Sequence, residues 1–180
     1  MRLGPFAGTS MKLMDSEALV LLLRSLTRGA FIARHYGLYM VITEGDSKVP
    51  ITFHTAAVSV ADKQKLEQMM AKPDKKPDYE VMAIAKAPGH PYPDRISVGR
   101  ARNCDLVLRD PSVSKLHAHF RTRENGKFDL VDLDSQNGTC VNGVQLAPNK
   151  PEPVWPGDTV SFGNVTAWLL DAGALFDLMK

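Results

Sequence analysis

Three short segments in the second half of the chain combine residue types that bind anions. Gly99-Arg100 places a guanidinium directly after an expected strand, and Ser114-Lys115 brings a hydroxyl and an ammonium just before another one. Gln136-Asn137-Gly138 adds amide donors at a turn sequence. A phosphate dianion is well bound by an arginine fork together with a second cation, a hydroxyl and N–H donors. The sequence therefore predicts an anion site, provided that the three segments meet in space.

The elements that must position these segments are short strands. From residue 79 onward, runs of alternating apolar and polar residues are interrupted by Gly, Asn, Asp and Pro at intervals of about 8–12 residues. That regularity favours an all-β sandwich or barrel, followed by a closing helix over residues 172–180. The expected strands cover residues 81–86, 95–98, 105–108, 117–122, 128–133, 138–141, 159–162 and 165–170.

The first part of the chain has a different pattern. It predicts a helix that begins near Asp15, a hairpin with strands on either side of residues 44–47, and a short helix over residues 62–72. The charged, proline-containing stretch 72–78 then predicts a linker. We therefore expect an α+β N-terminal extension with its linker over residues 1–78, followed by a β-sandwich with a C-terminal helix over residues 79–180.

The motifs of the second part, taken together, resemble the forkhead-associated (FHA) domain. The resemblance covers roughly residues 81–170 and rests on a Gly-Arg pair, a Ser-x-x-His motif and an Asn-Gly pair in the family's order and spacing. In this chain they read Gly99-Arg100, Ser114-Lys115-Leu116-His117 and Ser135-Gln136-Asn137-Gly138-Thr139. The resemblance implies a mainly β fold, in which a sandwich of two sheets gathers its binding loops at one end, and it implies recognition of phosphothreonine.

The resemblance also implies which residues contact the phosphopeptide. Arg100 and Ser114 would contact the phosphate, and Lys115 would assist them at a position where the family often has Arg or Asn. Asn137 would hold the backbone of the bound peptide, while Gln136 would touch the phosphate or the next residue. No catalytic residue and no cofactor is implied.

Other motif residues are expected to support the loops, namely Gly99, His117 and Gly138. Asn137-Gly138 suits a turn whether or not a ligand binds, so a ligand role and a purely structural role both stay open. His117 and His119 share one face of the expected strand, but no third ligand accompanies them, and we expect no metal site. Cys104 and Cys140 have neither metal-ligand spacing nor a catalytic motif.

Composition restricts the classes of function further. A net charge of only +2 over 180 residues gives no overall positive potential that would attract nucleic acid. No apolar run approaches the roughly 18 residues that a membrane span needs, and no secretion signal is evident. No Ser/His/Asp arrangement stands out, so we expect no enzymatic activity. With only two cysteines, the sequence predicts a cytoplasmic protein with free thiols.

The anion-binding motifs and the resemblance together imply a phosphothreonine-peptide recognition module, which acts as an adaptor in Ser/Thr-kinase signalling and binds a phosphothreonine-containing protein or peptide. Two alternatives stay open. The chain could be a scaffold that binds an unphosphorylated partner, or a regulatory subunit that docks through its N-terminal segment. Both alternatives keep the sandwich but do not need the anion site.

Overall fold

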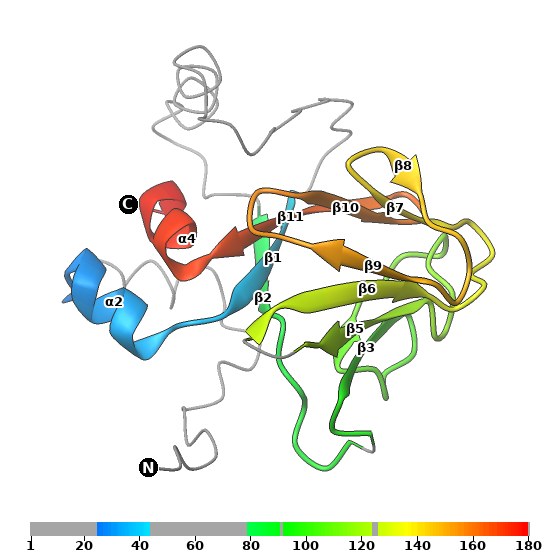
Figure 1. Ribbon diagram of the computed structural model, residues 1–180, viewed down its shortest axis with the longest axis horizontal. Coiled ribbons are helices and arrows are strands. Elements are labelled where there is room, and N and C mark those ends of the chain that lie inside the picture. Colours follow the sequence, from blue (N-terminus) through cyan, green and yellow to red (C-terminus); the bar gives the residue numbers. More distant parts are fainter. Residues whose placement is uncertain (1–24, 44–78, 91, 124–125, 180) are drawn as a thin grey trace.

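The described part of the chain folds into two β-sheets packed face to face, with two helices against the outer side of one sheet (Figure 1). The computed structural model describes residues 25–43, 79–90, 92–123 and 126–179. Sheet A has six strands in the order β2 (Tyr79–Ala83), β1 (Leu38–Thr43), β11 (Val165–Asp171), β10 (Thr159–Phe162), β7 (Thr139–Val141) and β8 (Val144–Gln145). Sheet B has five in the order β4 (Leu106–Val107), β3 (Arg95–Gly99), β5 (Ala118–Thr122), β6 (Phe128–Asp132) and β9 (Pro151–Val154).

Alternating side chains of the two sheets build the core between them. In β10, Val160 and Phe162 are fully buried while Thr159 and Ser161 are partly exposed, which is the period-two pattern of a strand with one face on a core. Phe162 meets Phe120 of sheet B edge to face, with 6.4 Å between the ring centroids. The sequence prediction of a mainly β sandwich is therefore confirmed.

Strand β1 comes from the segment that was expected to form an extension. It pairs antiparallel with β11 on one side and with β2 on the other, and it lies inside sheet A (Figure 1). Met40 points into the sandwich and is fully buried, while Tyr39 and Val41 are buried on the opposite face. Of the described residues before position 44, strand β1 is thus an integral part of the sandwich. A domain boundary at residue 78 stays a prediction.

The outer face of sheet A is covered by helices α2 (Arg28–Arg34) and α4 (Ala172–Met179). The Thr27 hydroxyl accepts a hydrogen bond from the Ala30 N–H and caps α2. The rings of Phe31 and Phe176 then pack 5.6 Å apart over β1. Helix α4 is the closing helix that the sequence predicted. Neither described helix is long and apolar enough to span a membrane.

The remaining expectations for the N-terminal part lie outside the described residues. They are the body of the helix that begins near Asp15, the second strand of the hairpin, and the helix over residues 62–72.

Candidate functional site

Three loops meet at the end of the sandwich that lies away from the two helices (Figure 1). The strand register requires this, because Val98 at the end of β3 pairs with Ala118 at the start of β5, which pairs in turn with Asp132 at the end of β6. The β3–β4 loop carries Arg100, the β4–β5 loop carries Ser114 and Lys115, and the β6–β7 loop carries Gln136 and Asn137. All five residues predicted to contact the peptide therefore lie on neighbouring loops.

Direct hydrogen bonds join these loops. The Arg100 N–H donates to the Ser114 carbonyl at 2.9 Å, and the Gln136 N–H donates to the Ser114 hydroxyl oxygen at 3.1 Å. The Asn137 side-chain amide donates to the Ser112 carbonyl at 2.7 Å. The β4–β5 loop is thus the middle of three connected loops, and Ser114 touches both of the others.

The Arg100 guanidinium is exposed, and its position is fixed by the neighbouring loop. Its Nε donates to the Val113 carbonyl at 3.1 Å, and the donors of the two terminal nitrogens remain for a ligand. Among the residues that the structure describes, no carboxylate pairs with Arg100 or with the exposed Lys115. Two uncompensated cations therefore stand beside the partly buried Ser114 hydroxyl, whose own proton remains available to donate.

Gly99 allows the first two loops to approach closely. A Cβ atom at this position would overlap the Lys115 carbonyl oxygen and would lie 2.9 Å from the carbonyl carbon and 3.0 Å from the Cys104 sulfur. The Cys104 thiol occupies the adjacent space and donates to the same carbonyl at 3.3 Å. Only glycine fits between these backbones, which agrees with the supporting role expected for Gly99.

His117 connects the second loop to the third. Its Nδ1 accepts from the Ser114 N–H at 3.0 Å, so the ring proton lies on Nε2 and is donated to the Gly138 carbonyl at 3.1 Å. The side chain is fully buried. Burial lowers the pKa of His117 below its ordinary value of 6.5, although the Gly138 carbonyl and the Asp132 carboxylate act in the opposite direction. The structure thus requires a neutral imidazole at this position.

Lowering the pH is therefore expected to weaken the fold. A group with a depressed pKa stabilises the folded state at a pH above its unfolded pKa and loses that contribution as the pH falls. The free energy of unfolding should therefore decrease as the pH falls below about 6.5. Burial also lowers the pKa of His119 and of His35, so all three contribute. NMR titration of the histidine ring signals separates them. A His117 that titrates at or above 6.5 would contradict the assigned hydrogen bonds.

The third loop is organised by a buried carboxylate that the sequence analysis missed. Asp132 accepts from the Ser135 N–H at 3.1 Å, from the Ser135 hydroxyl at 2.6 Å and from the Thr139 hydroxyl. Burial acts to raise the pKa of Asp132, but these hydrogen bonds outweigh it and hold the pKa below the ordinary value. An Asp-x-x-Ser spacing before an Asn-Gly turn is a local signal that could have identified this turn.

Gly138 and Asn137 complete the loop. Gly138 has a φ of +76° and its carbonyl accepts from both the His117 ring and the Gly163 N–H, so its left-handed conformation is held from two sides. Asn137 is exposed and uses its amide nitrogen on the Ser112 carbonyl, which leaves its amide oxygen free to accept from a ligand. Asn137 thus has a structural role that does not exclude a ligand role.

Replacing Asn137 with alanine is expected to affect the fold and the site together. The loss of one hydrogen bond to the Ser112 carbonyl should lower the free energy of unfolding by about 1 kcal/mol. If the amide oxygen also holds a ligand, affinity should fall further than in Ser161→Ala, a control on the partly exposed side of β10. Thermal unfolding and peptide titration of both variants measure the two effects. Unchanged stability would show that the Ser112 contact contributes nothing.

The arrangement can bind an oxyanion, because it joins a fixed guanidinium, an ammonium and a hydroxyl at the mouth of three connected loops. The described residues contain no group of three or more His, Cys, Asp or Glu side chains placed to hold a metal ion. Neither Cys104 nor Cys140 forms a disulfide. Burial raises the pKa of Cys104, which disfavours its reactive thiolate.

Comparison with known proteins assigns this region to a family. Residues 96–163 match the family model of the FHA domain. An oxoglutarate dehydrogenase inhibitor of Corynebacterium diphtheriae is 42% identical over 67 residues, which are 37% of this chain and 44% of the inhibitor. The glycogen accumulation regulator GarA of Mycobacterium tuberculosis is 50% identical over 46 residues, which are 26% of this chain and 28% of the regulator. The match thus spans less than half the length of either relative.

Among the solved structures to which this chain is similar is the N-terminal FHA domain of Rad53p from S. cerevisiae in complex with a phosphothreonine peptide. The alignment covers 78% of this chain and 98% of that chain, with 18% sequence identity and a TM-score of 0.45.

Proposed function

We propose that this chain, which contains an FHA domain, recognises a phosphothreonine-containing protein or peptide through the loops at the end of its sandwich. Recognition of phosphorylated motifs by arginine-bearing loops is an established mode of FHA domains. The observation that carries the proposal is the convergence of three loops on Ser114, with Arg100 fixed beside it and lacking a carboxylate partner among the described residues.

Each loop residue has a distinct role in this proposal. The terminal nitrogens of Arg100 and the Ser114 hydroxyl donate to the phosphate, and Lys115 adds a second positive charge. The Asn137 amide oxygen accepts from a backbone N–H of the peptide, and Gln136 donates to the phosphate or to the following residue. Gly99, His117 and Gly138 hold the loops and do not touch the ligand.

The proposed biological role is that of an adaptor or regulator in Ser/Thr-kinase signalling. Two relatives are named an inhibitor and a regulator, and FHA domains are binding modules, so we propose binding and no enzymatic activity. A cytoplasmic location belongs to the same proposal and is supported by the two free thiols.

An NMR titration with a phosphothreonine peptide tests the proposal at residue resolution. We expect the largest amide shifts at Arg100, at Ser114 and Lys115, and at Gln136 and Asn137, with little change on α2 and α4. The same peptide without its phosphate is the control. Equal shifts with both peptides would favour the phospho-independent scaffold. Shifts confined to residues of α2 or β1 would favour docking through the N-terminal segment.

A further inference from the structure

A groove lies next to the proposed phosphate site, on the side of the sandwich where both sheets end. Strand β2 is an edge of sheet A and β4 is an edge of sheet B, and the two edges border a groove of about 620 Å³. That volume lies within the range of roughly 300–1,000 Å³ that is common for ligand sites. The proposed contacts with the phosphate leave this groove unused.

The groove and the phosphate loops share a wall. Cys104 lines the groove, and its thiol donates to the carbonyl of Lys115 in the β4–β5 loop at 3.3 Å. Met82 and Leu106, which also line the groove, belong to the buried core and give it an apolar floor. The groove therefore begins directly beside the loops that carry the proposed phosphate site.

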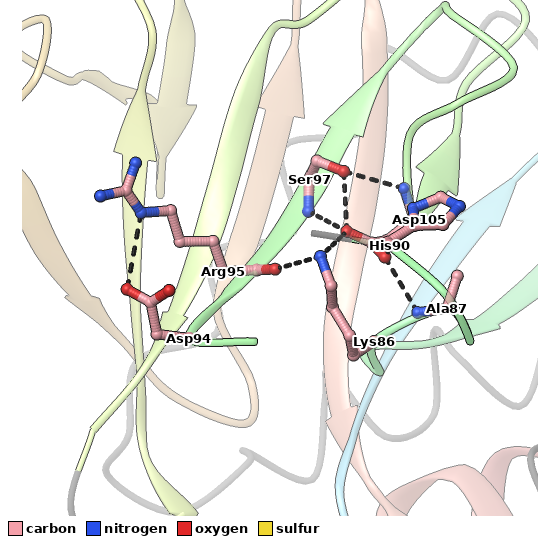
Figure 2. Close-up of polar contacts among 7 residues, drawn as sticks. All are labelled: Lys86, Ala87, His90, Asp94, Arg95, Ser97 and Asp105. Atoms are coloured by element: carbon pink, nitrogen blue, oxygen red, sulfur yellow. Dashed lines mark hydrogen bonds and ion pairs between the residues drawn. The ribbon is translucent and has the colours of Figure 1, made fainter. Parts of the chain in front are cut away.

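The charges inside the groove compensate one another. The fully buried Asp105 carboxylate accepts from the Lys86 ammonium at 2.9 Å, the Ser97 N–H at 2.7 Å and the Ala87 N–H at 2.9 Å, and the His90 ring also lies against it (Figure 2). These contacts hold the pKa of Asp105 below its ordinary value, although burial alone would raise it. Asp105 thus fixes the wall and offers no free negative charge.

The rim of the groove, in contrast, carries uncompensated positive charge. Arg102 and Arg109 are both exposed, and within the described residues neither makes a hydrogen bond or an ion pair. Glu80, the remaining acidic residue of the lining, is already engaged in an interaction. An apolar floor with two free guanidinium groups is complementary to an extended peptide that carries acidic side chains.

We propose that this groove binds the residues flanking the phosphothreonine and selects peptides with acidic residues there. The proposal rests on the phosphate site proposed above. Arg102 follows Arg100 by two positions in the same loop, and an extended peptide advances about 3.3–3.6 Å per residue. Residues within about four positions of the phosphothreonine can therefore reach the rim of the groove, where Arg102 and Arg109 lie.

The test is a set of phosphothreonine peptides in which one glutamate moves through about four positions on each side, against an otherwise neutral background. Affinities for the full chain are measured by fluorescence polarisation. On one side of the phosphothreonine, glutamate should bind about three- to fivefold better than glutamine at the same position. Arg102→Ala or Arg109→Ala should abolish that difference, while added salt should reduce it.

Arg121→Ala is the matched control, because Arg121 is exposed near the opposite end of β5 and does not line the groove. It should leave the preference for glutamate intact. If peptides bind but glutamate gives no advantage, or the advantage survives both groove variants, the groove is not a peptide site and the phosphate site stands. If no phosphothreonine peptide binds the wild-type chain, the proposed function itself fails.

Discussion

Replacing Arg100 with lysine is expected to weaken phosphothreonine-peptide binding by about tenfold or more, although the charge is kept. The guanidinium uses Nε on the Val113 carbonyl and has two further nitrogens for a phosphate. A lysine ammonium has no rigid fork, so it cannot hold the Val113 carbonyl and present two parallel donors at once. One lost hydrogen bond to a charged group corresponds to about 1.5–3 kcal/mol, hence the expected ratio.

Isothermal calorimetry on the folded variant measures this loss. Arg121→Lys serves as the control, because Arg121 is exposed on β5 away from the three loops and should bind like the wild type. An Arg100→Lys protein with wild-type stability and wild-type affinity would remove Arg100 from the site.

Replacing Gly99 with alanine is expected to disrupt the site through the backbone. The added methyl group would overlap the Lys115 carbonyl and press on the Cys104 sulfur, so the β3–β4 and β4–β5 loops must separate. Such overpacking costs about 1–3 kcal/mol of folding free energy. Since Arg100 and Lys115 move apart with the loops, affinity for a phosphothreonine peptide should also fall strongly.

Gly29→Ala is the matched control for this substitution. Gly29 lies in the first turn of α2, and a Cβ there would have no neighbour within 4 Å. Alanine is favoured over glycine inside a helix by roughly 0.5–1 kcal/mol, so this variant should be as stable as the wild type or slightly more stable. Chemical unfolding compares the two. A Gly99→Ala protein with unchanged stability and binding would show that the loops do not need the close approach.

The sequence predicted the sandwich well because its strands follow local rules. Alternation and turn residues identified every strand from β2 to β7, and β10 and β11 as well. Strand β9 was missed because Pro151 and Pro153 cannot donate to a ladder, and such a strand is accommodated only at an edge. Strand β8 was missed because both of its residues are exposed, so it has no buried face to produce an alternation of apolar and polar residues.

The position of β1 could not be derived from the sequence. Residues 38–42 were expected to form a strand, but local alternation does not reveal a partner that lies far along the chain. In the structure β1 pairs with β11, at a separation of more than a hundred residues (Leu38 opposite Asp171). The choice of pairing partner depends on the tertiary structure, because only a place beside β11 buries Met40 on one face of the sheet and Val41 on the other.

The sequence likewise predicted some residues of the candidate site and missed others. The motifs named residues that the structure brings together at one end of the sandwich, and their contact with a ligand stays a prediction. The residues that hold these loops, Ser112 and Asp132, were missed because their partners are distant in the sequence or depend on burial. Asn137 and Ser112, for example, are separated by 25 positions. Residue types can indicate a ligand, but they do not show which neighbours hold it in place.

The most direct test of phosphothreonine recognition is calorimetry with one peptide before and after phosphatase treatment. A peptide chosen from an oriented phosphothreonine library is titrated into the full chain, then dephosphorylated and titrated again. The proposed site predicts binding that is lost on removal of the phosphate and restored by rephosphorylation. Equal affinity in both states would contradict phosphothreonine recognition, whatever else the loops bind.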